Sequence, residues 1–207
     1  MLIAFEGIDG SGKTTQAELL MANLQTIGMD PVLLREPGAT PLGEKIRDIL
    51  LHGNDLNIMP VTEFLLFSAS RSQLVYEKLN ELLHAGRVVI LDRYFYSSIA
   101  YQGFGRGIAI NEIENISRFA TNGILPDIIF LLDLDIALAS ERLIKSGKFI
   151  DRMEKAEKDF YRKVLQGFRY CAEKDAGRFV VVDANADRDS IARDIFKEVL
   201  RRMKKND

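Results

Sequence analysis

The 207-residue chain has one cysteine, no tryptophan and no long run of hydrophobic residues. Cys171 cannot form a disulfide within the chain, and no zinc-type spacing accompanies it, so the sequence favours a cytoplasmic protein. No stretch approaches the ~18 apolar residues of a membrane span. The opening residues lack the basic and apolar regions of a secretory signal. We therefore expect no membrane contact.

An excess of charge of one sign is also lacking. The 28 lysine and arginine residues are balanced by 30 aspartate and glutamate residues, which leaves a net charge of −2. Proteins that bind nucleic-acid backbones are usually basic, so this balance disfavours a nucleic-acid partner. Hydrophobic residues make up 47% of the chain, enough for a packed core. The length and the absence of repeats or linkers predict a single domain over residues 1–207.

Short apolar runs alternate along the chain with longer amphipathic segments. The apolar runs predict five strands, at residues 2–6, 31–35, 88–91, 128–134 and 179–183. Helices are predicted near residues 13–27, 42–51, 60–84, 94–102, 111–122, 136–146, 153–175 and 188–204. This alternation predicts an α/β fold of three layers, with a five-stranded parallel sheet flanked by helices. Ligands of such sheets bind at the carboxyl ends of the strands.

A glycine-rich motif follows the first predicted strand. Residues 7–14, GIDGSGKT, match G-x-x-x-x-G-K-[ST] between a strand and a helix, the context that a P-loop requires. Glycines let backbone N–H groups surround a phosphate, and the helix adds the positive end of its dipole. The motif predicts that Lys13 bridges the β- and γ-phosphates and that Thr14 ligates Mg²⁺. The predicted nucleotide-binding residues of the loop are Gly7, Ile8, Asp9, Gly10, Ser11, Gly12, Lys13, Thr14 and Thr15.

The P-loop predicts a bound nucleoside triphosphate without specifying its use. A GTPase should carry N-K-x-D after a strand, but the fourth predicted strand ends in Asp133-Leu134-Asp135. A nucleic-acid motor should be larger and more basic. Phosphoryl transfer to a small molecule is therefore the main hypothesis, with a non-catalytic ATP-binding module as the alternative from another class.

The third predicted strand ends in an aspartate and an arginine. An apolar strand that delivers Asp92 to its carboxyl end matches the Walker B pattern, in which the aspartate holds Mg²⁺ directly or through water. The neighbouring Arg93 could hold the acceptor phosphate or the transferring group. Alternatively, Asp92 could cap a helix and Arg93 could form a surface ion pair.

Phe67 and Arg71 lie four residues apart on the helix predicted at 60–84, so they share a face. The ring offers a stacking surface for a base. The guanidinium offers donors that suit O4 of thymine or uracil and reject the amino group of cytosine. A core phenylalanine beside a solvated arginine is the alternative.

Together the motifs resemble thymidylate kinase, most closely the bacterial-type enzymes. The segments FEGIDGSGKTTQ, REPGATPLGEKIRDILL, FLLFSASRSQ, LDRYFYSSIAYQGFGR, LPDIIFLLDLD and DRME occur in the order expected of that family, from about residue 3 to 183. The resemblance implies a nucleoside-monophosphate-kinase fold that transfers phosphate from ATP, with Mg²⁺, to dTMP. Another pyrimidine nucleoside monophosphate kinase or a deoxynucleoside kinase is the alternative. The resemblance also implies a homodimer, and the helix at 60–84 is apolar on more than one face.

The resemblance assigns the base and C2′ of the sugar to five residues. It implies that Phe67 stacks on thymine and that Arg71 bonds O4. Ser98, with Gln102 nearby, would meet the N3 edge of the base, and Tyr101 would crowd C2′ and disfavour ribose. Tyr101 could instead pack in the core, and Ser98 could cap a helix start.

The resemblance also implies contacts to the rest of the acceptor. Asp9 would accept a hydrogen bond from the 3′-hydroxyl, and Arg93 and Arg47 would hold the acceptor phosphate. Glu36 and Pro37 are predicted to bind the substrate, at a position where the family often has a cis bond, although Glu36 could instead be a turn residue. Ala39 stands where the family commonly has glycine, which puts a left-handed turn there in doubt.

In the family a flexible lid covers the triphosphate, here at about residues 145–152. Ser146 stands where we would expect a lid arginine, which leaves Lys145, Lys148 and Arg152 as cationic candidates. We expect Arg142 and Arg152 to contact the triphosphate. The predicted catalytic residues are Lys13, Arg93, Asp9 and Arg152.

Overall fold

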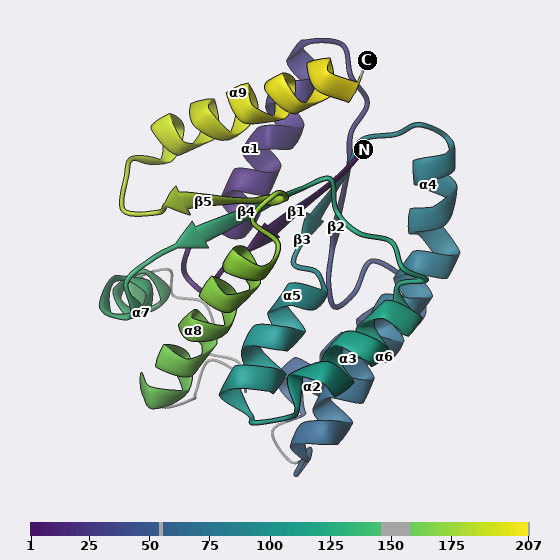
Figure 1. Cartoon of the computed structure of the whole chain (residues 1–207), viewed down its shortest axis with the longest axis vertical. Helices are drawn as coiled ribbons and strands as arrows, with labels where there is room; N and C mark the ends of the chain where they lie inside the picture. Colours follow the sequence, from purple (N-terminus) through teal and green to yellow (C-terminus); the bar gives the residue numbers. More distant parts are fainter. Residues whose placement is uncertain (54–55, 146–157, 207) are drawn as a thin grey trace.

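The computed structural model describes residues 1–53, 56–145 and 158–206. It contains a sheet of five parallel strands between two layers of helices (Figure 1). The strands are β1 (Leu2–Glu6), β2 (Val32–Arg35), β3 (Val89–Asp92), β4 (Ile128–Asp133) and β5 (Phe179–Asp183). The helices are α1 (Lys13–Thr26), α2 (Pro41–His52), α3 (Pro60–Leu74), α4 (Asn80–His84), α5 (Phe95–Ser98), α6 (Ile110–Ala120), α7 (Ile136–Lys145), α8 (Lys158–Lys174) and α9 (Arg188–Asn206).

The strands lie in the order β2-β3-β1-β4-β5, with β1 in the centre. Strands β1 and β3 are neighbours in a register that places Phe5 opposite Asp92. The carboxyl end of β3 therefore lies beside the loop that follows β1. The predicted α/β class, the parallel sheet and the five strands are confirmed.

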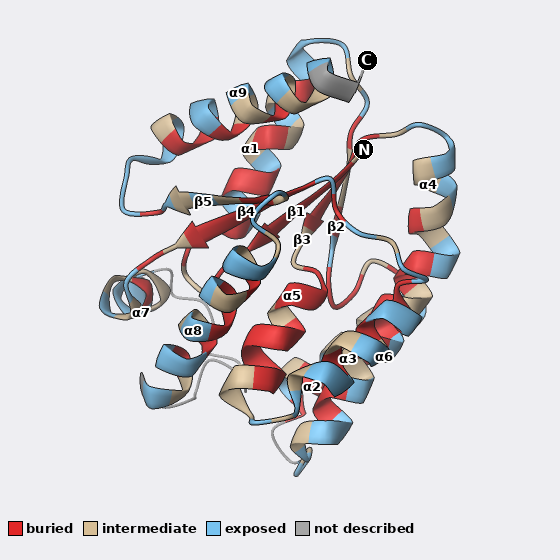
Figure 2. Cartoon of the chain, in the orientation of Figure 1, coloured by how far each residue is buried: buried red, intermediate tan, exposed pale blue. Residues whose placement is uncertain are grey.

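The central strands are buried on both faces, which explains their continuous apolar sequence (Figure 2). Helices α1 and α9 pack against each other on one face, and α5 and α8 cover the other (Figure 1). Phe5 of β1 and Phe130 of β4 are fully buried, with ring centroids 5.4 Å apart. Among the described residues, no helix combines the length and the apolar character needed to span a membrane.

Two predicted helices contain π-helical turns. The segment 60–84 consists of α3, the π-helical η1 (Val75–Leu79) and α4, and α5 continues as the π-helical η2 (Ile99–Gly105). Helix α8 packs closely on η2, since a Cβ on Gly167 would lie 2.7 Å from Cα of Ala100. These segments are only 5 and 7 residues long, too short for their apolar spacing to be distinguished from that of an α-helix, so the sequence pattern did not reveal them. The η2 segment carries Tyr101 and Gln102.

The remaining predicted boundaries differ from the observed ones mostly by one or two residues. Residues 146–152 of the predicted lid, with Arg152, and residues 153–157 of a predicted helix lie outside the described residues. Ala39 has φ of 63°, so the left-handed turn is present although the residue is alanine.

Candidate functional site

The loop between β1 and α1 forms a cradle at the carboxyl edge of the sheet. Gly7 and Gly10 have φ of 139° and 80°, in the region that favours glycine. A Cβ on Gly7 would lie 2.6 Å from the carbonyl oxygen of Leu132, and a Cβ on Gly10 would lie as close to that of Ala139. Both positions therefore need glycine for backbone conformation and for space.

Lys13 begins α1 and turns its amine back across this loop. Its Nζ donates a hydrogen bond to the carbonyl oxygen of Ile8 at 2.7 Å. Burial and the nearby Arg93 charge lower the pKa of Lys13 to about 8, although Asp9 acts in the opposite direction. A bound phosphate would favour the charged amine. The cradle therefore places a cation where the P-loop pattern predicts one.

The two residues predicted to hold a metal lie in contact. Oγ1 of Thr14 donates a hydrogen bond to Oδ2 of Asp92 at 2.5 Å. Hydroxyl and carboxylate oxygens are donors that suit Mg²⁺. Among the described residues, no group of three or more His, Cys, Asp or Glu could hold a metal by itself. The donors present fit a magnesium ion whose remaining ligands are phosphate and water oxygens. Asp92 does not cap a helix, because Tyr94 is the N-cap of α5.

Arg93 lies inside the site rather than in a surface ion pair. Its backbone is left-handed, with φ of 73°, and its side chain is 17% exposed. The guanidinium forms an ion pair with Asp9 and donates to the carbonyl oxygen of Gly7 at 2.9 Å and to Oγ of Ser97 at 3.0 Å. Burial acts to lower its pKa, but Asp9 and Tyr101 hold the pKa well above the usual value. The site therefore keeps a fixed positive charge here.

Asp9 connects the P-loop to the η2 segment. One of its carboxylate oxygens pairs with Arg93, and the other accepts a hydrogen bond from the Tyr101 hydroxyl at 2.9 Å. Burial acts to raise its pKa, but Arg93 and Lys13 hold the pKa below the usual value. Tyr101 also packs edge-on against Phe168, so it serves the core and the site together.

Behind Arg93 lies a buried carboxylate that no sequence motif predicted. Glu6 ends β1 and is fully buried. It accepts hydrogen bonds from the backbone N–H of Tyr94 at 2.9 Å and from Oγ of Ser97 at 2.6 Å. Because Ser97 also binds Arg93, Glu6 orders the arginine indirectly. An acidic residue at the end of an otherwise apolar strand was the signal that could have revealed it.

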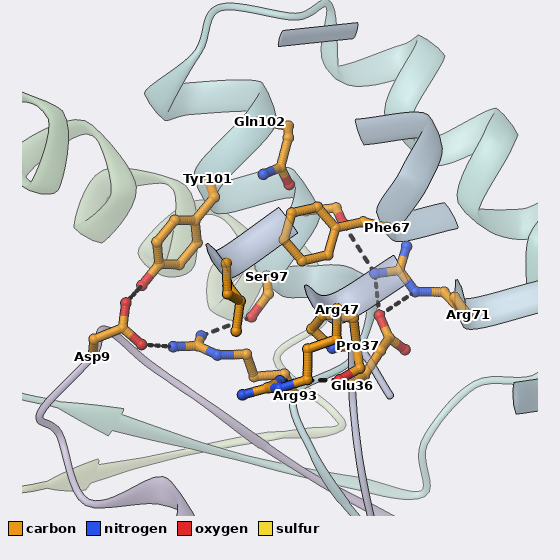
Figure 3. Close-up of a pocket in the computed structure, with 12 residues that line it drawn as sticks. Asp9, Glu36, Pro37, Arg47, Phe67, Arg71, Arg93, Ser97, Tyr101 and Gln102 are labelled. Atoms are coloured by element: carbon orange, nitrogen blue, oxygen red, sulfur yellow. Dashed lines mark hydrogen bonds and ion pairs between the residues drawn. The ribbon is translucent and has the colours of Figure 1, made fainter. Parts of the chain in front are cut away.

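A hollow beside Arg93 is lined by all nine predicted substrate-binding residues (Figure 3). These residues are Glu36, Pro37, Arg47, Phe67, Arg71, Arg93, Ser98, Tyr101 and Gln102. Asp9, Leu51 and Ser97 complete the lining, and of these Leu51 and Ser97 were not predicted. The Glu36-Pro37 bond is cis, as expected. Tertiary folding thus brings residues of five segments to one cavity.

Arg71 is a buried residue, not a solvated one. Its side chain is 1% exposed and forms an ion pair with Glu36. Nε donates to Oε1 of Glu36 at 2.6 Å, and Nη2 donates to Oγ of Ser98 at 3.0 Å. Nη1 of Arg71 is buried without a hydrogen-bond partner among the described residues, as is Oε2 of Glu36. The guanidinium therefore keeps one donor uncommitted. Ser98 precedes η2 but its hydroxyl makes no capping hydrogen bond there, so its interpretation as a helix-start cap was wrong.

A second hollow runs along the P-loop and joins the first. Its lining includes Gly10, Ser11, Gly12, Lys13, Thr14, Thr15, Asp92 and Arg142, whereas Gly7 and Ile8, which were also predicted to bind the nucleotide, are not among its lining residues. Arg142 donates to the carbonyl oxygen of Ala184 at 3.0 Å, beside the end of β5. Both hollows are lined by Asp9, Arg47 and Arg93. Ligands in the two hollows would therefore meet at Arg93.

Comparisons with known proteins identify relatives of this chain. The model of the thymidylate kinase family matches residues 5–195. A curated thymidylate kinase of Pelotomaculum thermopropionicum is 42% identical over 94% of this chain and 90% of its own length. One of Kosmotoga olearia is 40% identical over 99% of this chain and 98% of its own length. The crystal structure of thymidylate kinase from Ehrlichia chaffeensis has a TM-score of 0.79 and 32% identity, and covers 96% of this chain and 98% of its own.

The buried Glu6 predicts a pH-dependent stability. Burial raises the pKa of Glu6 from 4.5 to about 7. Between these values the folded protein holds a proton that the unfolded chain releases, so stability falls as pH rises. We expect the unfolding free energy of the wild type, relative to Glu6→Gln, to drop by about 3 kcal/mol from pH ~4 to pH ~8. Urea unfolding across this range measures the difference, and parallel pH curves would contradict the assignment.

Proposed function

Because the chain belongs to the thymidylate kinase family, we propose that its two connected hollows hold the two nucleotides of that reaction end to end. The protein phosphorylates dTMP to dTDP with ATP, a step in dTTP synthesis. We assign ATP to the P-loop hollow and dTMP to the hollow beside Phe67. The observation that carries this proposal is the junction at Arg93, where both hollows share their lining.

The donors left uncommitted support the assignment of the thymine base. The half-buried ring of Phe67 lines the hollow and offers a stacking surface. Glu36 and Ser98 occupy two nitrogens of Arg71, so Nη1 remains to donate to O4 of thymine. Gln102 would meet the N3 edge of the base.

With the base in this position, the residues that would contact the sugar and the acceptor phosphate can also be assigned. Asp9 would accept a hydrogen bond from the 3′-hydroxyl, and the ring of Tyr101 would crowd C2′. Arg93 and Arg47 would hold the acceptor phosphate. Arg47 donates to the carbonyl oxygen of Pro37 at 3.0 Å, which keeps its guanidinium at the base of the hollow.

The proposed mechanism needs no general base. The acceptor phosphate has a second pKa near 6, so it is already a dianion at neutral pH. Catalysis then consists of in-line positioning and compensation of negative charge. Lys13 would compensate charge on the triphosphate, and Arg93 would compensate charge where the acceptor phosphate and the transferring phosphoryl group meet. Thr14 and Asp92 would hold Mg²⁺, which supplies further charge neutralisation at the phosphates. Arg142 and Arg152 remain the candidates for additional triphosphate contacts.

A turnover panel tests the proposed acceptor. We expect ATP·Mg²⁺ to phosphorylate dTMP far more efficiently than UMP, CMP or thymidine, with dUMP as the nearest competitor because it shares O4 and N3–H. The Lys13→Ala variant controls for contaminating kinases and should be folded but inactive. A preference for thymidine would favour a deoxynucleoside kinase, and ATP binding without transfer to any acceptor would favour a binding module.

The buried ion pair predicts separable effects on stability and affinity. Arg71→Met leaves the Glu36 carboxylate buried and uncompensated, so we expect a loss of about 3 kcal/mol of stability. Adding Glu36→Gln should recover most of this stability, as measured by thermal unfolding. In the double variant the KM for dTMP should stay at least ~10-fold above wild type because the donor to O4 is absent, while the KM for ATP changes little. Equal increases of both KM values would count against base recognition by Arg71.

We also propose that the protein is a cytoplasmic homodimer. Exposed apolar side chains gather on α2 and α3, which pack together, and on the segments that flank α3. They are Leu42, Ile49, Met59, Val61, Leu65 and Tyr76. Such a surface is typical of a protein interface. The lone cysteine, Cys171, is buried and unpaired, in keeping with a reducing compartment.

Light scattering tests the dimer directly. At micromolar concentration we expect twice the chain mass of 23.4 kDa. Leu65→Glu places a charge on the apolar surface and should reduce the mass to that of one chain without loss of helix content by circular dichroism. A single-chain mass for the wild type would reject the dimer.

A further inference from the structure

A buried glutamate stands behind the wall of the hollow that we assign to dTMP. Glu63 lies in the first turn of α3 and is 1% exposed. Its Oε1 accepts a hydrogen bond from Nε2 of Gln102 at 3.0 Å. The Arg106 guanidinium lies 3.5 Å from the same oxygen. Glu63 does not line the hollow, but Gln102 does.

This hydrogen bond fixes the orientation of the Gln102 amide, that is, which position its nitrogen and its oxygen occupy. A carboxylate accepts hydrogen bonds and does not donate them, so the NH₂ group of Gln102 must face Glu63. The carbonyl oxygen, Oε1, then takes the other position. Among the described residues no group donates to Oε1 of Gln102, so an acceptor remains available on a side chain of the hollow (Figure 3).

Arg71 contributes the complementary group. Its Nη1 is a buried donor without a partner among the described residues. In the view of Figure 3, Arg71 and Gln102 lie on either side of the Phe67 ring. The hollow thus offers one donor and one acceptor, both fixed by a buried glutamate. Thymine presents O4 as acceptor beside N3–H as donor, which matches the pair. Cytosine presents an amino donor in place of O4 and an unprotonated N3 acceptor in place of N3–H. Both of its groups are therefore mismatched with this donor and acceptor.

We propose that Glu63 is a positioning residue for base selection, which holds the Gln102 amide with its acceptor towards N3–H of the pyrimidine. The assignment rests on the proposed dTMP site. An amide free to turn over would exchange acceptor for donor and could then bind N3 of cytosine. By preventing that exchange, Glu63 excludes cytosine without touching the nucleotide.

Replacing Glu63 by glutamine tests the proposal, because the new amide accepts either orientation of Gln102. For Glu63→Gln we expect the KM for dTMP to change by less than about threefold, since the original orientation stays accessible. The inhibition constant of dCMP against dTMP turnover should fall about tenfold, as one mismatched contact becomes a hydrogen bond. A purely structural role for Glu63 would shift both nucleotides together and leave their ratio unchanged.

A reciprocal exchange provides the rescue. In Glu63→Gln/Gln102→Glu the carboxylate at position 102 can only accept, and the amide at position 63 donates to it. The acceptor towards N3–H is then fixed again, so the ratio of dCMP inhibition constant to dTMP KM should return to the wild-type value. A ratio that stays at the level of Glu63→Gln would overturn the proposal.

The chain offers a matched control on its surface. Nε2 of Gln73 donates to Oε2 of Glu77 at 2.7 Å in an exposed pair outside the hollow. Glu77→Gln makes the same chemical change to the same kind of pair and should leave the ratio at the wild-type value.

If thermal unfolding shows that Glu63→Gln does not fold, a modified substrate tests the proposal with the wild-type protein. The wild-type enzyme should bind an analogue of dTMP with C–H in place of N3–H about tenfold more weakly than dTMP. Equal affinity would show that Gln102 presents no acceptor and would overturn the proposal. A wild type that does not phosphorylate dTMP would instead refute the proposed function, so the two failures are distinguishable.

Discussion

Mutual repulsion between two polyanionic nucleotides is the constraint around which this site is built. Charges at close range in a partly buried site interact far more strongly than in water, so the two phosphates can approach only if fixed cations lie between them. Arg93 occupies that position, at the junction of the two hollows. Arg93 can occupy this position because β1 and β3 are neighbours in the sheet and end side by side.

Three of the proposed ligand contacts are held in place by buried glutamates. Glu6 orders Arg93 through Ser97, Glu36 orders Arg71, and Glu63 orders Gln102. A buried carboxylate without a partner would be costly, so each one forces its neighbour into a single arrangement. The result is a cavity whose donors and acceptors are set before a nucleotide arrives, which reduces the ordering that binding would otherwise require.

The sequence predicted the fold and the membership of the site better than the arrangement within it. Asp92, P-loop residues 9–15 and the nine residues assigned to the substrate line the two hollows, because motif spacing fixes which strand or helix end carries each side chain. The solvated interpretation of Arg71 failed because exposure depends on the partner, Glu36, which lies 35 residues away. Glu6 and Glu63 were missed because neither belongs to the phosphate-binding or base-reading motifs, and their roles arise only through contact with residues that do.

By itself, the sequence determined the alternation of strands and helices, the glycines that a phosphate cradle needs and the residue types available for chemistry. These depend on local conformation and on spacing along the chain. Tertiary structure alone decided which nitrogen and oxygen atoms stay free for a ligand. That choice depends on hydrogen bonds between side chains far apart in the sequence, such as Gln102 and Glu63, and no local pattern encodes which atoms such bonds will occupy.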